Sequence, residues 1–188
     1  MQNQTLQWLP LSQSEGAYKF QVQGLSFNNH LMAGSDEFSL GVVDSGTTFT
    51  YMPFKLFNMV RAHFEWFCSN DPQTLCKGKM KKLDGDSSIC FEYDEDVFAE
   101  GPKFYFMSYP LLQLLVTDVN GDKTTLKWYP SEYLYRYNQD SYCLAVEQYN
   151  RPTEILLGGT FMRQNAFVFD VEANRVGVVR ARCNNDPN

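Results

Sequence analysis

The sequence has few of the residues that commonly hold metals, and it has no long apolar run. Only two of its 188 residues are histidines, and none of its five cysteines belongs to a Cys-x-x-Cys pair. Zinc sites are built from clusters of these two residue types, so we expect no metal, and we expect no cofactor either. No apolar stretch reaches the length of about eighteen residues that a membrane-spanning helix needs.

A signal-peptide pattern is also missing. Residues 1–10 are polar and lack a basic end followed by an apolar stretch, so we expect no secretory leader within this chain. The cysteines nevertheless favour disulfides, which persist in oxidising compartments such as those of the secretory pathway. Because their number is odd, at least one is left over. They are Cys68, Cys76, Cys90, Cys143 and Cys183.

Positive charge is in the minority. The chain has 16 Lys and Arg against 22 Asp and Glu, a formal net charge of −6. This balance argues against nucleic acid as a partner, which would favour a basic surface. Hydrophobic residues make up 44% of the chain and charged residues 20%, as in ordinary globular domains. The length suits one domain with its own core.

Most of the chain has the pattern of β-strands. Residues 18–25 alternate, with Tyr18, Phe20 and Val22 on the apolar face and Lys19 on the polar face. Asn120-Gly121 is a strong hairpin signal between two further strands. The remaining predicted strands cover residues 38–43, 111–117, 124–128, 167–170 and 175–180. We therefore predict an all-β domain with little helix.

One amphipathic helix is predicted directly after Pro53. Apolar residues recur there at spacings of three and four, which is the pattern of a helix with one buried face. These residues are Phe54, Phe57, Val60, Phe64 and Phe67. A short second helix is predicted at residues 161–164. The polar stretch 69–88 is predicted to be a long surface loop.

The stretch GVVDSGTTFTYMP, residues 41–53, carries the strongest candidate for chemistry. A β-branched strand ends at Asp44, and Ser45, Gly46 and Thr47 form a turn behind it. The backbone N–H of Gly46 and the hydroxyl of Thr47 can donate to the carboxylate, and such donors favour its ionised form. An aspartate with an ordinary role in a strand-end turn is the simpler alternative.

A second stretch, residues 154–170, reads EILLGGTFMRQNAFVFD. Its apolar strand, Ile155-Leu156-Leu157, ends in Gly158-Gly159. Glycines in this position let another backbone segment pass very close, because they have no Cβ. The two stretches together therefore favour a functional role for Asp44 more strongly than either one alone.

In this order and spacing, the two stretches resemble the C-terminal lobe of pepsin-like aspartic proteases, and the closing strand Asn174–Val178 resembles that family too. The resemblance implies one lobe of the acid protease fold, with closed or partly open barrel-like sheets and a short amphipathic helix. It covers residues 17–183, with 1–16 as an inter-lobe segment and 184–188 as a tail. The loop between Cys68 and Cys76 is more similar to protist-type or plant-type members.

The resemblance also implies roles for individual residues. Asp44 would be catalytic and would lie at a loop tip beside the Gly-Gly strand. Ser45 would lock with its counterpart across the lobe interface, and Thr47 would support the carboxylate with Gly46. The residues expected to border the substrate groove are Val42, Thr48 and Leu156. The interface around Val42, Ser45 and Leu156 is expected to be apolar, because the other lobe would cover it.

The resemblance extends to the cysteines and the compartment. Cys90 and Cys143 fall where this lobe usually has its disulfide. Cys68 is then expected to pair with Cys76, which leaves Cys183 free or destined for another lobe. A protein of this family with disulfides is expected in the secretory pathway, in a vacuole or lysosome, or outside the cell.

The chemistry of the family needs a second aspartate, because two neighbouring carboxylates share one proton. The sequence contains no second Asp-[Ser/Thr]-Gly, so we expect a partial chain whose first lobe is missing. The leading hypothesis is an aspartic endopeptidase lobe that acts on peptide or protein substrates and is inactive alone. The alternatives are a homodimer in which each copy supplies Asp44, as in retroviral-type proteases, and a non-catalytic peptide-binding or inhibitor-like module.

Overall fold

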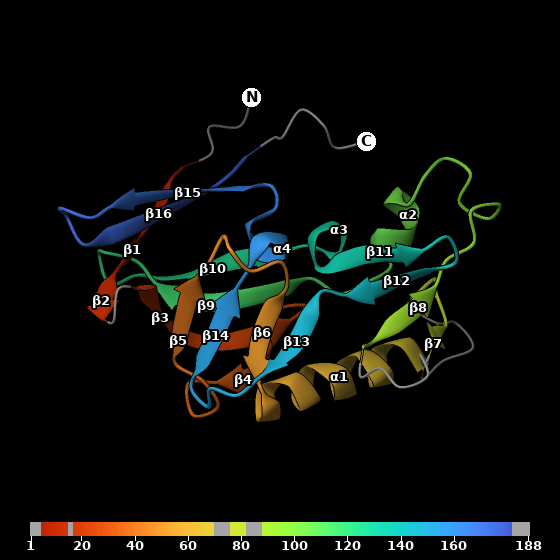
Figure 1. Ribbon diagram of the computed structural model, residues 1–188, viewed down its shortest axis with the longest axis horizontal. Coiled ribbons are helices and arrows are strands. Elements are labelled where there is room, and N and C mark those ends of the chain that lie inside the picture. Colours follow the sequence, from red (N-terminus) through yellow and green to blue (C-terminus); the bar gives the residue numbers. More distant parts are fainter. Residues whose placement is uncertain (1–4, 15–16, 70–75, 82–87, 182–188) are drawn as a thin grey trace.

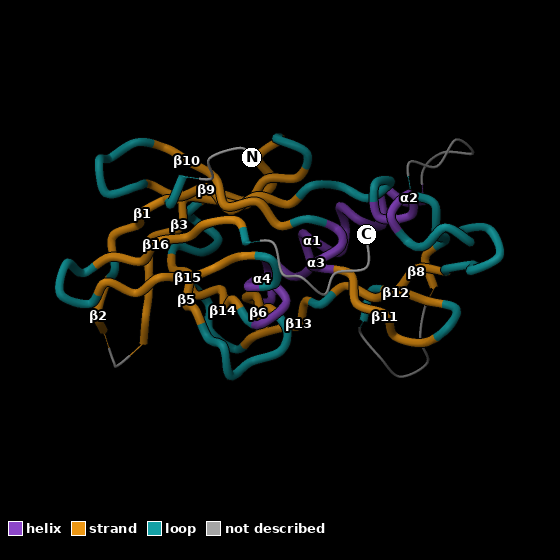
Figure 2. The backbone as a smooth tube through the Cα atoms, turned by 90° about the horizontal axis from the view of Figure 1, so that it is seen from above, coloured by secondary structure: helices purple, strands orange, loops and turns teal. Residues whose placement is uncertain are grey.

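The computed structural model describes residues 5–14, 17–69, 76–81 and 88–181, and it consists mainly of β-strands (Figure 1). A nine-stranded sheet has the order β10-β9-β3-β5-β14-β6-β13, with β2 and β4 also paired to β3. A three-stranded sheet, β1-β16-β15, lies on one side of it, and a four-stranded sheet, β11-β12-β8-β7, lies at the far end (Figures 1 and 2). The all-β prediction is confirmed.

The elements have the following bounds. The strands are β1 (Gln7–Pro10), β2 (Ser12–Ser14), β3 (Ala17–Phe27), β4 (His30–Gly34), β5 (Leu40–Val43), β6 (Thr50–Pro53), β7 (Met80–Lys81), β8 (Cys90–Glu92), β9 (Leu112–Thr117), β10 (Lys123–Trp128), β11 (Leu134–Asn138), β12 (Ser141–Leu144), β13 (Val146–Tyr149), β14 (Glu154–Leu157), β15 (Asn165–Asp170) and β16 (Arg175–Arg180). The helices are α1 (Phe54–Ser69), α2 (Lys103–Phe106), α3 (Pro130–Tyr133) and α4 (Gly159–Met162).

Helix α1 is confirmed, but its buried face differs from the predicted one. Val60 and Phe64 are fully buried, whereas Phe54 is 60% exposed. Phe54 lies two three-residue steps before Val60. Each such step falls about 60° short of a full helical turn, so the Phe54 side chain points about 120° away from that of Val60 and from the core. Leu56, fully buried, takes its place on the inner face. The shorter predicted helix also shifts, because α4 ends at Met162 and Gln164 has a positive φ.

Strand β3 alternates as predicted except at its start. Phe20 and Val22 are buried, but Tyr18 is 40% exposed and Lys19 is only 5% exposed. The ammonium group of Lys19 lies 2.7 Å from the carboxylate of Glu154, which is itself mostly buried. A lysine can be buried when a carboxylate compensates its charge, and this partner lies far away in the sequence.

The structure contains one hairpin that the sequence predicted and one that it did not. The hairpin around Asn120-Gly121 is confirmed, but its connection is longer than two residues, and only Gly121 has a positive φ. The Asp118 carboxylate holds this turn by accepting the N–H groups of Asn120 and Asp122. A two-residue turn that the sequence did not predict, Asn28-Asn29, joins β3 to β4, and both of its residues have positive φ.

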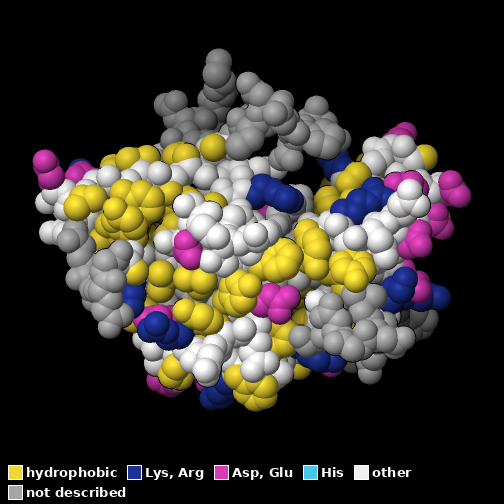
Figure 3. Space-filling model, viewed as in Figure 1, with side chains coloured by type: hydrophobic (Ala, Val, Ile, Leu, Met, Phe, Trp, Pro, Cys, Tyr) yellow, Lys and Arg dark blue, Asp and Glu magenta, His cyan; other side chains and the backbone are white. Residues whose placement is uncertain are grey.

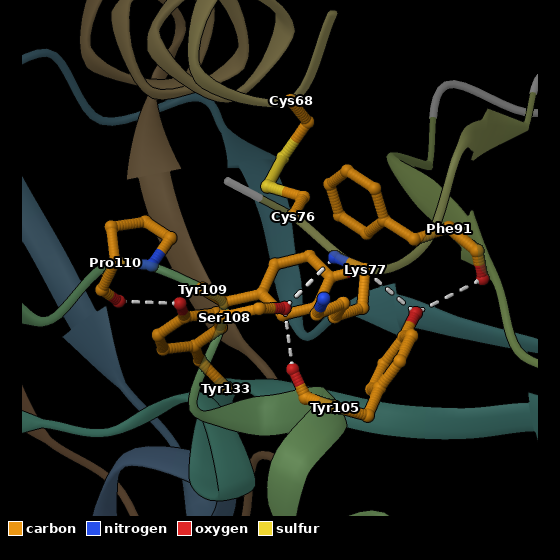
Figure 4. The surroundings of a disulfide bond; sticks show 9 residues. All are labelled: Cys68, Cys76, Lys77, Phe91, Tyr105, Ser108, Tyr109, Pro110 and Tyr133. Atoms are coloured by element: carbon orange, nitrogen blue, oxygen red, sulfur yellow. Dashed lines mark hydrogen bonds between the residues drawn. A yellow bond between two sulfur atoms is a disulfide. The ribbon is translucent and has the colours of Figure 1, made fainter. Parts of the chain in front are cut away.

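Both predicted disulfides are confirmed, Cys68–Cys76 and Cys90–Cys143. Cys183 lies outside the described residues. The predicted surface loop at 69–88 is wrong in the part that the structure describes, because β7 pairs with β8 there and Cys76 is buried. That segment is anchored where the Lys77 backbone N–H donates to Ser108 Oγ, at 2.9 Å (Figure 4).

A group of buried tyrosines lies beside the Cys68–Cys76 disulfide (Figure 4). The hydroxyl of Tyr109 donates to that of Tyr105 over 2.8 Å, and the hydroxyl of Tyr133 donates to the Pro110 carbonyl. Burial raises the pKa of each of these tyrosines above its ordinary value. The three hydroxyls therefore stay protonated and serve as structural hydrogen-bond groups.

We expect the two disulfides to stabilise the chain unequally. A cross-link restricts the unfolded chain more when it closes a longer loop, and the two sequence separations are 53 and 8. Replacing Cys90 and Cys143 by Ala should lower the free energy of unfolding by about 4 kcal/mol, and replacing Cys68 and Cys76 by about 2.5 kcal/mol. Urea unfolding followed by circular dichroism measures both. A larger loss from the Cys68–Cys76 variant would contradict the loop-length explanation.

Candidate active site

The two glycine-containing stretches meet in the centre of the large sheet. Strand β14 lies between β5, with which it is parallel, and β6, with which it pairs antiparallel at Leu156 and Tyr51. The loop that joins β5 to β6, residues 44–49, must therefore pass over the end of β14. The backbone N–H of Asp44 donates to the Leu157 carbonyl at 3.1 Å, which places Asp44 beside the Gly-Gly segment, as predicted.

Gly158 makes this crossing possible. A Cβ at Gly158 would lie 2.1 Å from the Phe49 carbonyl oxygen and 2.6 Å from that of Thr47, which is closer than any real Cβ approaches a backbone oxygen. Directly after it, the Gly159 N–H donates to the Thr47 carbonyl at 2.7 Å. The Thr160 N–H donates to the Thr48 carbonyl at 3.0 Å. The loop is therefore fixed to the strand by backbone contacts.

The carboxylate of Asp44 is held at both oxygens. The Gly46 N–H donates to Oδ1 at 2.9 Å, and the Thr47 hydroxyl donates to Oδ2 at 2.6 Å. These are the two donors expected from the sequence. They fix the direction of the carboxylate, since each of its oxygens has a donor of its own. A carboxylate so placed can accept a proton from water or a hydroxyl group.

The surface next to Asp44 is less apolar than the sequence suggested. Ser45, Gly46 and Thr48 are exposed, whereas Val42 is buried within β5 and Leu156 is half-buried. Of the predicted groove residues, Thr48 thus has the most accessible side chain. Val42 contributes little surface because it is only 7% exposed.

Several residues that support this site were not predicted. The Lys19–Glu154 ion pair joins β3 to the start of β14, across the strand that ends at Asp44. The Trp128 indole N–H donates to the Thr160 carbonyl at 3.3 Å, on the far side of the crossing. Glu154 begins the Gly-Gly stretch and could have drawn attention, but nothing in the sequence marks Lys19 as its partner.

The described residues contain no group of three or more His, Cys, Asp or Glu side chains that could hold a metal ion. None of the helices in the described ranges is long and apolar enough to cross a membrane. The groups in contact with the Asp44 carboxylate are the backbone amide of Gly46 and the hydroxyl of Thr47.

Comparisons with known proteins agree with this geometry. The family model described as "Xylanase inhibitor C-terminal" matches residues 17–179. Plasmepsin V of Plasmodium falciparum, in its isolates 3D7 and NF54, is 25% identical over 186 residues, an alignment that covers 88% of this chain and 30% of plasmepsin V. The crystal structure of basic 7S globulin from soybean superposes with a TM-score of 0.69 at 19% identity, over 93% of this chain and 42% of that one.

These matches show the family and the fold. The chain spans less than half the length of plasmepsin V or of basic 7S globulin. The family model covers nearly all of the described residues, including both stretches that meet at Asp44. The chain thus belongs to the xylanase inhibitor C-terminal family and has the fold of the C-terminal lobe of a pepsin-like aspartic protease.

Proposed function

We propose that the chain is the C-terminal lobe of an aspartic endopeptidase and that it contributes Asp44 as one of two catalytic carboxylates. The observation that carries this proposal is the double anchoring of Asp44, at 2.9 Å from Gly46 N–H and 2.6 Å from the Thr47 hydroxyl. The loop that carries Asp44 is itself fixed to β14 by backbone hydrogen bonds, so the carboxylate has a defined position as well as a defined direction.

The proposed mechanism is general acid–base hydrolysis of a peptide bond. Asp44 and a second aspartate from another lobe would share one proton, because two carboxylates this close do not both ionise readily. The ionised member takes a proton from water while the protonated one donates to the carbonyl oxygen of the substrate. Gly46 and Thr47 keep the Asp44 carboxylate aimed throughout, and Thr48 contacts the substrate beside it.

The proposal includes the chain's partners and surroundings. Residues 17–183 would form the lobe, 1–16 would lead in from the first lobe, and 184–188 would be a tail. Ser45, which is exposed, would meet its counterpart on the first lobe. The substrate would be a peptide or protein. The two disulfides support an oxidising compartment of the secretory pathway, a vacuole or lysosome, or the outside of the cell.

A second candidate function is non-catalytic binding. The matching family model is described as a xylanase inhibitor domain, which favours a lobe that binds a protein and does not cleave it. In that case the anchored Asp44 would remain as part of the fold. The two functions differ in turnover and in the consequence of removing the carboxylate.

The chain alone provides the first test. It should fold as one lobe but show no peptide hydrolysis, because it contributes a single anchored aspartate and half of a groove. The assay uses an unstructured peptide at about pH 4–5, with and without a pepstatin-like inhibitor. Cleavage that the inhibitor blocks, and that rises with the square of the protein concentration, would instead establish a homodimer with two Asp44 side chains.

The full-length protein, with its upstream lobe, separates the two remaining functions. Inhibitor-sensitive hydrolysis supports the protease. Absence of hydrolysis together with saturable binding to a xylanase would support the inhibitor and would overturn the catalytic role of Asp44.

A further inference from the structure

A separate groove lies between helix α1 and the β3–β4 hairpin. It has a volume of about 370 Å³, and its apolar walls are Phe27, Leu31, Trp66 and Phe67. Strands β5 and β14 point away from β4 and α1 toward α4, so the groove is remote from the crossing that holds Asp44 (Figure 1). No histidine side chain is coloured on the face drawn in Figure 3.

One wall of the groove is a firmly anchored hairpin tip. Asn28 and Asn29 form its two-residue turn, and Asn28 exchanges two hydrogen bonds with the backbone of Leu111, at 2.9 and 2.8 Å. The Asn29 N–H donates to the Gln113 side chain at 3.2 Å. The wall is therefore formed before any ligand arrives, and binding would not have to order it.

The floor and the opposite wall are aromatic. The Phe27 ring is buried, and it meets the rings of Phe64 and Phe67 edge-on at 5.4 and 5.3 Å. At the rim, Trp66 is 60% exposed and Leu31 is 64% exposed. Large apolar side chains that face solvent around a hollow are typical of a ligand site, because a ligand removes them from water.

The titratable groups that line the groove are the only two histidines of the chain, His30 and His63. His63 Nδ1 lies 2.8 Å from the Met59 carbonyl. Since a carbonyl only accepts, Nδ1 donates this hydrogen bond, and Nε2 is the other polar atom of the ring. The ring is also held against Phe27, with centroids 5.6 Å apart.

Among the residues that the structure describes, no Asp, Glu, Lys or Arg lines the groove. On α1, Arg61 is bonded to Glu65 at 2.9 Å, and Lys55 to Glu37 at 3.2 Å. The strands that contact α1 add the charged residues Glu147 of β13 and Lys81 of β7, which are not among the lining residues. Protonation of the imidazoles would thus give an otherwise uncharged lining a positive charge.

We propose that this groove binds a small apolar anion, a molecule with an aromatic or short hydrocarbon body and one carboxylate or sulfonate group. The body would lie between Trp66 and Leu31 on the Phe27 floor, and the anionic group would meet the imidazoles of His30 and His63. A protonated imidazole is the charged group that this lining can offer to the anion.

The test is calorimetric titration of the chain at pH 5.5 with 2-naphthoate and with its neutral analogue 2-naphthalenemethanol. We expect one saturable site, with a dissociation constant for 2-naphthoate at least about fivefold lower than for the analogue, the effect of roughly one exposed ion pair. Trp66→Ala should weaken binding at least about tenfold, since it removes one wall. His30→Gln combined with His63→Gln should abolish this preference for the anion, and the amide group introduced at position 63 can still donate to the Met59 carbonyl.

The matched control is Phe54→Ala, which removes an equally exposed aromatic ring from the same helix outside the groove. It should leave binding unchanged, and thermal unfolding checks that each variant folds. The proposal is overturned by no saturable binding, by equal losses from Trp66→Ala and Phe54→Ala, or by equal affinities for 2-naphthoate and 2-naphthalenemethanol. None of these results bears on the catalytic role proposed for Asp44.

Discussion

Replacing Asp44 by Asn in the full-length protein should lower the rate of peptide hydrolysis by about 10²–10⁴-fold, the usual contribution of a general acid or base. Asn keeps the size of the side chain and one oxygen, which can still accept the Gly46 N–H. It cannot hold the shared proton or accept one from water. The loss should therefore appear in kcat, measured with a peptide substrate at about pH 4–5, with folding largely intact.

Asp118→Asn is the matched control for this experiment. Asp118 is another aspartate of the same lobe whose carboxylate accepts backbone N–H groups in a turn, so its replacement removes the same charge and a similar local contact. Its activity should remain near that of the unmodified protein. Full turnover in Asp44→Asn, or an equal loss in both variants, would show that Asp44 does not take part in the chemistry.

Replacing Gly158 by Ala should prevent the chain from reaching its native structure. The added methyl would lie 2.1 Å from the Phe49 carbonyl oxygen, which is rigid backbone and cannot turn aside as a side chain would. Relief requires β14 to separate from the Asp44 loop, which breaks the hydrogen bonds that hold the crossing. The backbone of Gly158 is extended, a conformation that Ala adopts freely, so the expected effect is purely steric.

Gly159→Ala separates this steric effect from a general cost of replacing glycine. Its added methyl would lie 3.6 Å from the nearest backbone oxygens, which is ordinary contact. We expect a normal cooperative urea transition for Gly159→Ala, within about 1 kcal/mol of the unmodified chain, and none for Gly158→Ala. A cooperative transition of similar midpoint in both variants would contradict the close approach at Gly158.

The sequence predicted the geometry of the Asp44 turn well because its main determinants are local. The donors to the carboxylate, Gly46 and Thr47, lie two and three residues beyond it, so the turn chemistry can be recognised directly. The close passage at Gly158 also leaves a local mark, since few features other than missing space require a glycine after an apolar strand.

What could not be predicted depends on residues distant in the chain. The alternating pattern of its strand predicts that Lys19 lies on the polar, exposed face. The side chain is buried instead, because the carboxylate of Glu154 compensates its charge. The surface expected around Val42 is small, because that residue is only 7% exposed. Phe54 fits the three- and four-residue spacing of an amphipathic helix, but its side chain lies outside the core. This spacing does not determine which residue is at the centre of the buried face.

The hairpins illustrate the same limit for turns. Asn120-Gly121 is a strong signal, yet the carboxylate of Asp118 extends that turn beyond two residues. Asn28-Asn29 is a weaker pattern because Asn tolerates positive φ less readily than Gly. Its conformation is stabilised by the backbone of Leu111, whose position the local sequence does not reveal.

The insertion of β14 between β5 and β6 has a consequence for the order of folding. Strands β5 and β6 are almost adjacent in the chain, but the strand that separates them follows more than about a hundred residues later. Pairings between such distant segments form slowly, because a long loop must close before any contact is gained. During synthesis, the Asp44 loop therefore stays unassembled until nearly the whole lobe has left the ribosome, so a protease built on this lobe would gain its catalytic geometry only in the last stage of folding.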